Sequence, residues 1–291
     1  MDRKAVRQTR LRQGAGLFIL LLAVLAAAPA AAGALERLFA PRADRWAFWD
    51  VRNDHSDQVI DHSQWDALLR HYVVKGQDGI NRLAYAQFTA EDRQRLDDYI
   101  DTMAQRPIRQ YSGMQQLAYW INLYNALTVQ TVLQYYPLDS IRDIDISPGF
   151  LADGPWGKQL LSIEGQALSL NDIEHRILRP IWQDPRLHYA LNCASLGCPN
   201  LQDRAFAAED IDAMLDQAAA AYINHPRGVS IESGKLYVSS IYSWFQSDFG
   251  GSDTAVITHL QQFAEPALQA ELAGIKRITA DRYDWALNDA P

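Results

Sequence analysis

Residues 113–136, GMQQLAYWINLYNALTVQTVLQYY, are the stretch that decides the fold. A stripe of mainly apolar side chains recurs along it at helical spacing: Leu117, Ile121, Tyr124, Thr128 and Val132. Ser112 followed by Gln115 predicts a capping box, and Pro137 predicts the end of the helix. Because apolar residues also occupy nearly every other side, we expect a buried central helix from about Gly113 to Tyr136.

Two amides interrupt this apolar stretch, Asn122 and Asn125. A buried amide without hydrogen-bond partners costs about 1–3 kcal/mol, so both must find partners. They could pin the backbone of a neighbouring loop. Alternatively, one of them could orient a catalytic histidine. The sequence leaves both interpretations open.

Both cysteines of the chain lie in one segment, Asp184–Asn200, which reads DPRLHYALNCASLGCPN. Its first half alternates in the manner of a strand, so Leu187–Cys193 is expected to be extended, with His188 and Cys193 on opposite faces. A helix with Glu174 and His175 precedes it, capped by Ser169 or Asn171 and ended by Pro180. Chemistry, if the protein carries any, is expected here.

In the first interpretation of this segment, Cys193 is a nucleophile, because a thiolate beside an imidazole is reactive. His175 is the preferred base, since it comes from a separate helix, and His188 is the second candidate. The orienting group would be Glu174 or one of the helix amides, Asn122 and Asn125. The expected reaction is acyl transfer or hydrolysis of an amide or ester, with Trp156, Asn192 and Arg179 as substrate-binding residues.

Three other interpretations stay open. An oxidising compartment would favour a disulfide between Cys193 and Cys198, with a structural or redox role. His175, His188 and the two cysteines have side chains that suit zinc, although their spacing follows no standard zinc pattern. The thiols could also be small packing groups. The chain has no phosphate-binding glycine loop and no nucleophile-elbow motif, and no cofactor is expected.

The N-terminal residues 1–33 have the pattern of an export signal: a basic start, an apolar run from Gly16 to Ala27, and small residues around Ala30. We therefore expect a periplasmic or otherwise exported protein, with an uncleaved anchor as the alternative. Removing residues 1–33 takes away five basic residues and one acidic residue, so the formal net charge changes from -8 to -12. This balance disfavours nucleic acid as a partner, and an unknown small molecule or peptide is expected instead. No membrane span is expected after signal removal.

Four segments together resemble the family catalogued as domain of unknown function 547. They are Tyr119–Leu127, Ile173–Arg179, Asp184–Pro199 and Ser240–Phe249, and they follow in the family's order over roughly residues 110–250. The resemblance implies a bacterial, commonly exported protein and assigns no activity. A looser similarity is to papain-like and transglutaminase-like thiol enzymes. The chain departs from their pattern, because its core helix carries asparagines and its cysteine follows His175.

The expected organisation is a signal peptide over residues 1–33, a helical covering segment over 34–110, and a family core domain over 111–291 that ends in a helix and a strand. The fold class is α+β, a mostly helical single domain with small antiparallel hairpins around the buried central helix. Besides those already described, the expected elements are helices over Ser63–Val74, Thr89–Arg106, Ala208–Asn224, Ile241–Gly250 and Thr254–Ala273, hairpins over Gln159–Leu170 and Val229–Val238, and a last strand within Lys276–Asn288.

Overall fold

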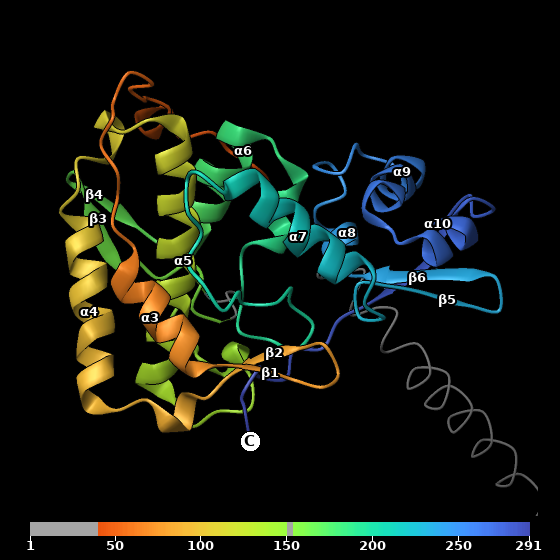
Figure 1. Cartoon of the computed structure of the whole chain (residues 1–291), viewed down its shortest axis with the longest axis horizontal. Coiled ribbons are helices and arrows are strands. Elements are labelled where there is room, and N and C mark those ends of the chain that lie inside the picture. Colours follow the sequence, from red (N-terminus) through yellow and green to blue (C-terminus); the bar gives the residue numbers. More distant parts are fainter. Residues whose placement is uncertain (1–39, 150–153) are drawn as a thin grey trace, which may run out of the picture. The chain divides into compact units, whose positions relative to one another are not determined.

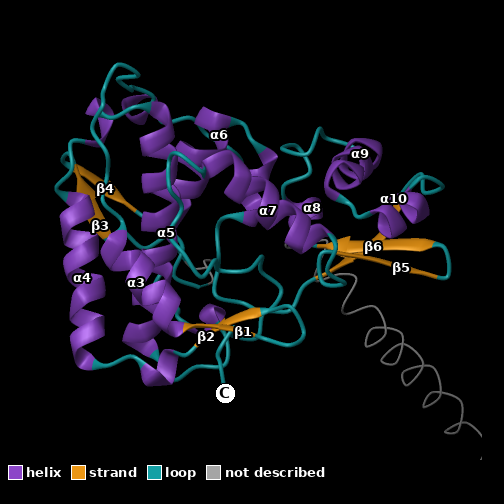
Figure 2. Cartoon of the chain, viewed as in Figure 1, coloured by secondary structure: helices purple, strands orange, loops and turns teal. Residues whose placement is uncertain are grey.

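The computed structural model describes residues 40–149 and 154–291. Residues Pro41–Pro291 form one compact unit. Helices predominate, with three small sheets among them, which confirms a mostly helical α+β fold (Figures 1 and 2). The expected export signal and residues 150–153 lie outside the described residues. No described helix is both long and apolar enough to span a membrane.

The central helix is α5, Gly113–Tyr135, and every residue from Gln116 to Val129 is buried in it. Helix α4, Ala90–Ala104, packs on α5, and α3, Ser63–Tyr72, packs on α4 (Figure 1). Helix α4 is capped by Thr89, whose side chain accepts a hydrogen bond from the Asp92 backbone N–H. The predicted cap of α5 is wrong: Ser112 makes no side-chain cap bond, and Gln115 Oε1 accepts from the Ile60 N–H instead.

The three sheets are short. Antiparallel pairs form between β1, Val73–Lys75, and β2, Asn81–Leu83, and between β3, Leu161–Ile163, and β4, Gln166–Leu168. In the third sheet, β5, Val229–Glu232, and β6, Lys235–Ser239, form the second predicted hairpin. The last strand, β7, Ile278–Arg282, pairs with β6 in parallel. A parallel pair needs a long crossover, and the intervening helices provide it: α8, Ile241–Trp244; α9, Asp253–Phe263; α10, Pro266–Leu272.

The buried apolar side chains form two clusters. The first surrounds α3, α4 and α5, and the second lies among α7, Ile211–Ile223, the β5–β6 hairpin and α9. The cysteine segment belongs to both, because Leu187 packs in the first cluster and Tyr189 in the second. The cysteines therefore follow directly on a segment that joins the two cores.

The expected strand Leu187–Cys193 is wrong. Pro185–Tyr189 is a 3-10 helix, and turns follow it. Pro185 stands in its first turn, and the Asp184 side chain accepts from the Arg186 N–H as its cap. Leu187, His188 and Tyr189 are all buried, because cores lie on both sides. The alternation that predicted a strand is thus a run of residues buried on every side, and the opposite-face argument for His188 and Cys193 no longer applies.

Two other helix boundaries differ from expectation. The helix with His175 contains a π-helical segment, Asp172–Leu178, and continues without a break into α6, Arg179–Trp182, so Pro180 does not end it. Helix α8 is a single turn rather than a helix that reaches Gly250. The remaining short helical turns are Ala47–Trp49, Tyr85–Gln87, Ile108–Gln110 and Ile141–Asp143.

Candidate functional site

The two asparagines of α5 hold loop backbone. Asn125 Nδ2 donates to the Ala190 carbonyl at 2.9 Å, and its Oδ1 accepts from the Asn192 N–H at 2.9 Å. Asn122 makes the same pair of bonds with a single residue, Phe206, donating at 2.8 Å and accepting at 2.9 Å. In the described part of the chain neither amide bonds an imidazole. In this way the polar atoms of each amide and two buried backbone groups all have hydrogen-bond partners. The backbone held by Asn125 comes directly before the first cysteine.

Asn192 continues this bracing inside the cysteine loop. Its Nδ2 donates to the Pro199 carbonyl at 2.8 Å, and its Oδ1 accepts from the Ala194 N–H at 2.9 Å. The C-terminal segment pairs with the loop as well, since the Gly197 N–H donates to the Asp284 carbonyl at 2.8 Å. A Cβ at Gly197 would lie 2.7 Å from the Asp284 backbone N, so this close approach needs glycine. The loop is therefore rigidly held on two sides.

Both cysteines are free thiols, and their sulfurs lie 2.9 Å apart. Cys193 is partly exposed, whereas Cys198 is 3% exposed. Cys193 Sγ also lies 3.0 Å from Tyr283 Oη and 3.3 Å from Ser195 Oγ. Ser195 Oγ is in turn 3.0 Å from Tyr283 Oη, as its donor. Cys193 Sγ is thus the last acceptor in a series of hydrogen bonds that runs from Ser195 through Tyr283.

These contacts set the acidity of the two thiols. The hydrogen bond from Cys198 lowers the pKa of Cys193, with the Ser195 and Tyr283 hydroxyls acting in the same direction against the effect of burial. Burial raises the pKa of Cys198 well above its ordinary value. Burial also raises the pKa of Tyr283, so its hydroxyl keeps the proton that it donates. When one proton leaves the pair, the negative charge belongs on Cys193.

The predicted histidines lie in a different polar group. Arg179 forms a two-pronged ion pair with Asp248, with Nε at 2.6 Å and Nη2 at 3.2 Å from its carboxylate oxygens. Arg179 Nη1 lies 2.8 Å from His175 Nδ1, and His188 Nε2 lies 2.9 Å from Asp248 Oδ2. Both imidazoles and the guanidinium are buried. We call these four residues, His175, Arg179, His188 and Asp248, the histidine cluster.

Hydrogen-bond chemistry fixes the tautomer of each imidazole. A guanidinium only donates, so His175 Nδ1 accepts and the neutral ring carries its proton on Nε2. Burial lowers the pKa of His175 to about 4, so the ring is neutral at pH 7 and has no lone pair left for a base. Asp248 only accepts, so His188 Nε2 carries a proton and its neutral form has a lone pair on Nδ1.

The carboxylate of Asp248 is ionised. Burial acts against its charge, but hydrogen bonds from His188 and Arg179 hold its pKa well below the usual range. The arrangement of His188 and Asp248 is that of a base and the carboxylate that orients it. Of the two histidines predicted as bases, the geometry therefore suits His188 better than the preferred His175.

Aromatic side chains lead from the histidine cluster to Cys193. Phe245 stacks on His188 with ring centroids 4.5 Å apart and carries the Arg179 guanidinium 4.4 Å from its centroid. Its neighbour Trp244 packs against Tyr283 at 4.8 Å, and Tyr283 bonds Cys193 Sγ. Trp285 stacks on Trp244 at 5.5 Å. The thiol and His188 thus lie at the two ends of one run of side-chain contacts.

The other predicted residues lie near these groups. Trp156, a predicted substrate-binding residue, is half-buried against Trp285, with ring centroids 5.7 Å apart. Glu174 accepts from the Tyr124 hydroxyl at 3.0 Å, and its other oxygen is 3.8 Å from His175 Nδ1. Within residues 40–149 and 154–291, no hydrogen bond joins Cys193 to either imidazole. The predicted direct thiol–imidazole contact is therefore absent from the described structure.

Two residues of this region were missed by sequence reasoning, Asp248 and Tyr283. Asp248 lies inside the quoted segment Ser240–Phe249, so the resemblance contained it, although nothing in the spacing marked it as a partner for Arg179 and His188. Tyr283 lies 90 residues after Cys193, and no local signal could have found it. The described residues include no group of three or more His, Cys, Asp or Glu side chains placed to hold a metal ion, so the four zinc candidates are not gathered.

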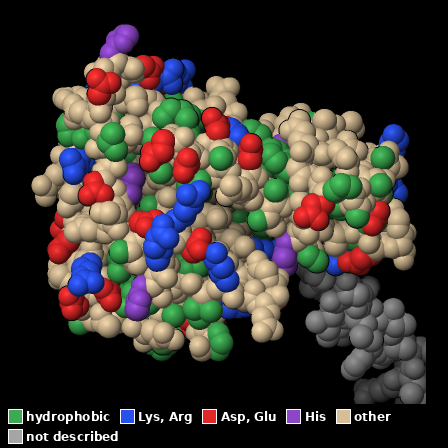
Figure 3. Space-filling model, in the orientation of Figure 1, with side chains coloured by type: hydrophobic (Ala, Val, Ile, Leu, Met, Phe, Trp, Pro, Cys, Tyr) green, Lys and Arg blue, Asp and Glu red, His purple; other side chains and the backbone are tan. Residues whose placement is uncertain are grey.

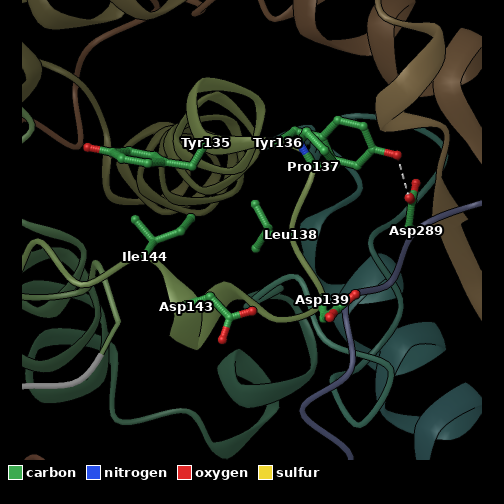
Figure 4. Close-up of a pocket in the computed structure, with 8 residues that line it drawn as sticks. All are labelled: Tyr135, Tyr136, Pro137, Leu138, Asp139, Asp143, Ile144 and Asp289. Carbon is green, nitrogen blue, oxygen red and sulfur yellow. Dashed lines mark hydrogen bonds between the residues drawn. The ribbon is translucent and has the colours of Figure 1, made fainter.

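A separate cavity of about 650 Å³ lies beyond the C-terminal end of α5 (Figure 4). Its lining combines aromatic and apolar side chains with three aspartates: Tyr135, Tyr136, Pro137, Leu138, Asp139, Asp143, Ile144 and Asp289. The Tyr136 hydroxyl donates to Asp289 Oδ2 at 2.7 Å beside it. None of the predicted site residues lines this cavity.

Fold and site together define a helical α+β protein with a paired-thiol loop between two cores. The family model described as "Protein of unknown function, DUF547" matches residues 108–223, and this match supports the resemblance to that family over this part of the chain. The match includes α5, the helix with His175 and the cysteine loop, and it ends before Asp248 and Tyr283. No curated protein and no solved structure matches the chain.

Proposed function

We propose that the protein is a thiol enzyme in which Cys193 is the nucleophile for acyl transfer from, or hydrolysis of, an amide or ester. One observation carries the proposal. Residue Cys193 is partly exposed, and its Sγ has three hydrogen-bonding neighbours, Cys198, Ser195 and Tyr283, all of which favour its thiolate. Only a thiolate attacks a carbonyl at a useful rate, and here neutral donors support it without an imidazolium.

The reaction would proceed in two steps. The thiolate attacks the carbonyl carbon, the bond to the amine or alcohol breaks, and the leaving group takes a proton from solvent. A thioester on Cys193 remains. Water then attacks the thioester and gives its proton, by way of solvent, to His188 Nδ1, the carbon–sulfur bond breaks, and the thiolate returns. His188 releases the proton to solvent, which restores the proton taken in the first step.

In this proposal the histidine cluster has divided roles. Asp248 and Arg179 orient His188, while His175 offers its Nε2 proton as a hydrogen-bond donor. Trp156 would contribute to substrate binding from the aromatic run. Asn192, whose side chain already has partners within the loop, would support the site as a positioning residue. Tyr283 is the donor that stabilises the reacting sulfur.

Localisation and partner are also proposals. The pattern of residues 1–33 supports export to the bacterial periplasm, with a small molecule or peptide as the substrate. Acidic and basic side chains are interspersed on the face shown in Figure 3, where no large basic patch would attract nucleic acid.

The first test is alkylation of the folded protein by iodoacetamide as a function of pH. We expect Cys193 to react with a midpoint below about 8.5, the ordinary value for a free thiol, and Cys198 to be protected. Assay against a panel of p-nitrophenyl esters and amides follows. The Cys193→Ser variant should lose at least about 1000-fold in kcat/KM. An inert Cys193 in the folded protein would reject the proposal.

The alternative is a non-catalytic envelope module in which Cys193 and Cys198 form a structural disulfide. The proximity of the two sulfurs favours it. This alternative predicts that the protein purified from the periplasm has no reactive thiol, and that reduction lowers its stability without creating any activity. Reduction that instead switches on ester or amide cleavage supports the enzyme.

A further inference from the structure

The two cysteines differ in every property that distinguishes an attacking thiol from a resolving thiol. Cys193 is partly exposed and has hydroxyl neighbours, whereas Cys198 is 3% exposed and lies behind it. Cys198 Sγ also accepts the Cys193 backbone N–H at 2.9 Å. Of the two residues, Cys193 is therefore the one nearer to solvent.

The sulfurs are also within easy reach of each other. They lie 2.9 Å apart, and a disulfide of about 2.05 Å needs them to approach by less than about 1 Å. The loop between them turns at Ala194, which has a φ of 59°, and the Cys198 N–H donates to the Ser195 carbonyl at 3.1 Å. The turn that brings the sulfurs together is thus already formed in the dithiol.

We propose that Cys193 and Cys198 are a redox-active pair that reduces a disulfide-bearing substrate, with Cys193 as the attacking thiol and Cys198 as the resolving thiol. This activity rests on the proposed nucleophilicity of Cys193 and names a second class of substrate for it, a peptide or small-molecule disulfide. Tyr283 and Ser195 serve both reactions, because each begins from the same thiolate.

The exchange balances as follows. The Cys193 thiolate attacks one sulfur of the substrate disulfide, that bond breaks, and the first substrate thiolate leaves and takes a proton from solvent. Cys198 loses its proton to solvent and attacks the Cys193 sulfur, and the second substrate thiolate leaves and is protonated in turn. Two electrons pass to the substrate, which becomes two thiols, while the protein becomes the Cys193–Cys198 disulfide.

The test uses the full-length reduced protein and the aromatic disulfide 5,5′-dithiobis(2-nitrobenzoate). The wild type should release about two equivalents of the coloured thiolate, the second at a rate independent of reagent concentration, because the resolving step is intramolecular. Its mass should fall by two hydrogens, with no adduct left. The Cys198→Ser variant should release about one equivalent and keep the adduct on Cys193.

Each contrary outcome is specific. A wild type that keeps a stable adduct after one equivalent shows that Cys198 does not resolve, which overturns this inference and leaves the nucleophilic Cys193 intact. Unreactive Cys193 in both proteins overturns the proposed function as well. A Cys193→Ser variant that reacts as fast as the wild type shows that Cys198 is itself accessible, and the assigned order is then wrong. Circular dichroism of each variant confirms that it is folded before the comparison.

Discussion

The cysteine loop and the histidine cluster both bury polar groups, but the loop pairs neutral groups and the cluster pairs charged ones. In the cysteine loop, neutral amides and hydroxyls form hydrogen bonds with neutral partners. There the Cys193 sulfur is the atom whose negative charge the neighbours stabilise. In the cluster, a full ion pair between Arg179 and Asp248 is buried, and the two imidazoles complete its hydrogen bonds. The sequence suggested one thiol–imidazole pair, and the structure gives each side its own set of partners.

Because of this difference, the two regions should respond differently to the loss of one partner. Removing one neutral partner leaves a group without a hydrogen bond, which costs a moderate free energy. Removing one charge leaves the opposite charge buried and unpaired, which costs more. Substitutions in the two regions should therefore differ in size and in what they disturb, and the following four experiments rank these effects.

The largest effect is expected from Asp248→Ala. This change leaves the buried Arg179 guanidinium without its ion pair and His188 without its orienting carboxylate. Loss of one partner of a buried pair costs about 3–5 kcal/mol of unfolding free energy, measurable by urea denaturation. Glu232→Ala breaks the exposed ion pair with Arg282 and should change little. Equal losses in the two variants would contradict the proposed importance of the histidine cluster.

Asn125→Ala and Asn122→Ala form a matched pair. Each removes two hydrogen bonds from α5 to buried loop backbone and should cost about 2–4 kcal/mol. Only Asn125 holds the cysteine loop, so only its variant should also change the alkylation rate of Cys193. Should both variants change that rate alike, the two amides act through general destabilisation and not through the loop.

The histidine cluster also predicts a pH dependence. Burial lowers the pKa of His175 from 6.5 to about 4, so between these values the unfolded chain binds more protons than the native protein. Stability should therefore rise with pH from 4 to 6.5 and be lost on acidification. His175 should contribute on the order of 2 kcal/mol to this change. His62 and His259, whose pKa is also lowered to about 4 by burial, act in the same direction.

The variant His175→Gln isolates the contribution of this residue, because its amide oxygen can still accept from Arg179. Denaturant titrations at pH 4.5 and pH 7 should show a smaller difference for the variant than for the wild type. An unchanged difference would mean that His175 titrates normally in the folded protein.

The smallest effect is expected from Tyr283→Phe. The ring keeps its packing against Trp244 and Trp285, and the change removes only the hydroxyl that donates to Cys193. The thiol pKa should rise, and iodoacetamide alkylation at pH 7 should slow by about 3- to 10-fold, with a stability change below about 1.5 kcal/mol. Tyr237→Phe, which removes a hydroxyl from β6, is the control and should leave the rate unchanged. A faster Tyr283→Phe variant would show that the hydroxyl does not stabilise the thiolate.

Much of the fold followed from local patterns. The stripe and the flanking proline located α5, and turn residues such as Glu164–Gly165 located the β3–β4 and β5–β6 hairpins. The cysteine loop did not follow, because burial from two cores imitates the alternation of a strand. The parallel pairing of β7 with β6 could not be predicted from the sequence either, because β6 lies some 40 residues earlier and three helices intervene.

For the candidate site, the sequence identified the segments but not the contacts. Cys193, Cys198, His175 and His188 were all selected from one short region, and the pairing of the sulfurs was among the alternatives. Arg179 was selected as a substrate-binding residue, whereas its guanidinium is held by the ion pair with Asp248 and by hydrogen bonds to His175 and to the Pro41 carbonyl. Asp248 meets Arg179 and His188 only in the folded chain.

By itself, the sequence determined the buried central helix, the polar residues that must find partners in it, and the loop that holds both thiols, because each depends on spacing within about 25 residues. Only the tertiary structure decided which side chains meet. Tyr283 reaches Cys193 and Asp248 reaches Arg179 and His188 across 60 to 90 residues of sequence. Local periodicity carries no information over that distance, and the packing of two cores against one loop supplies it.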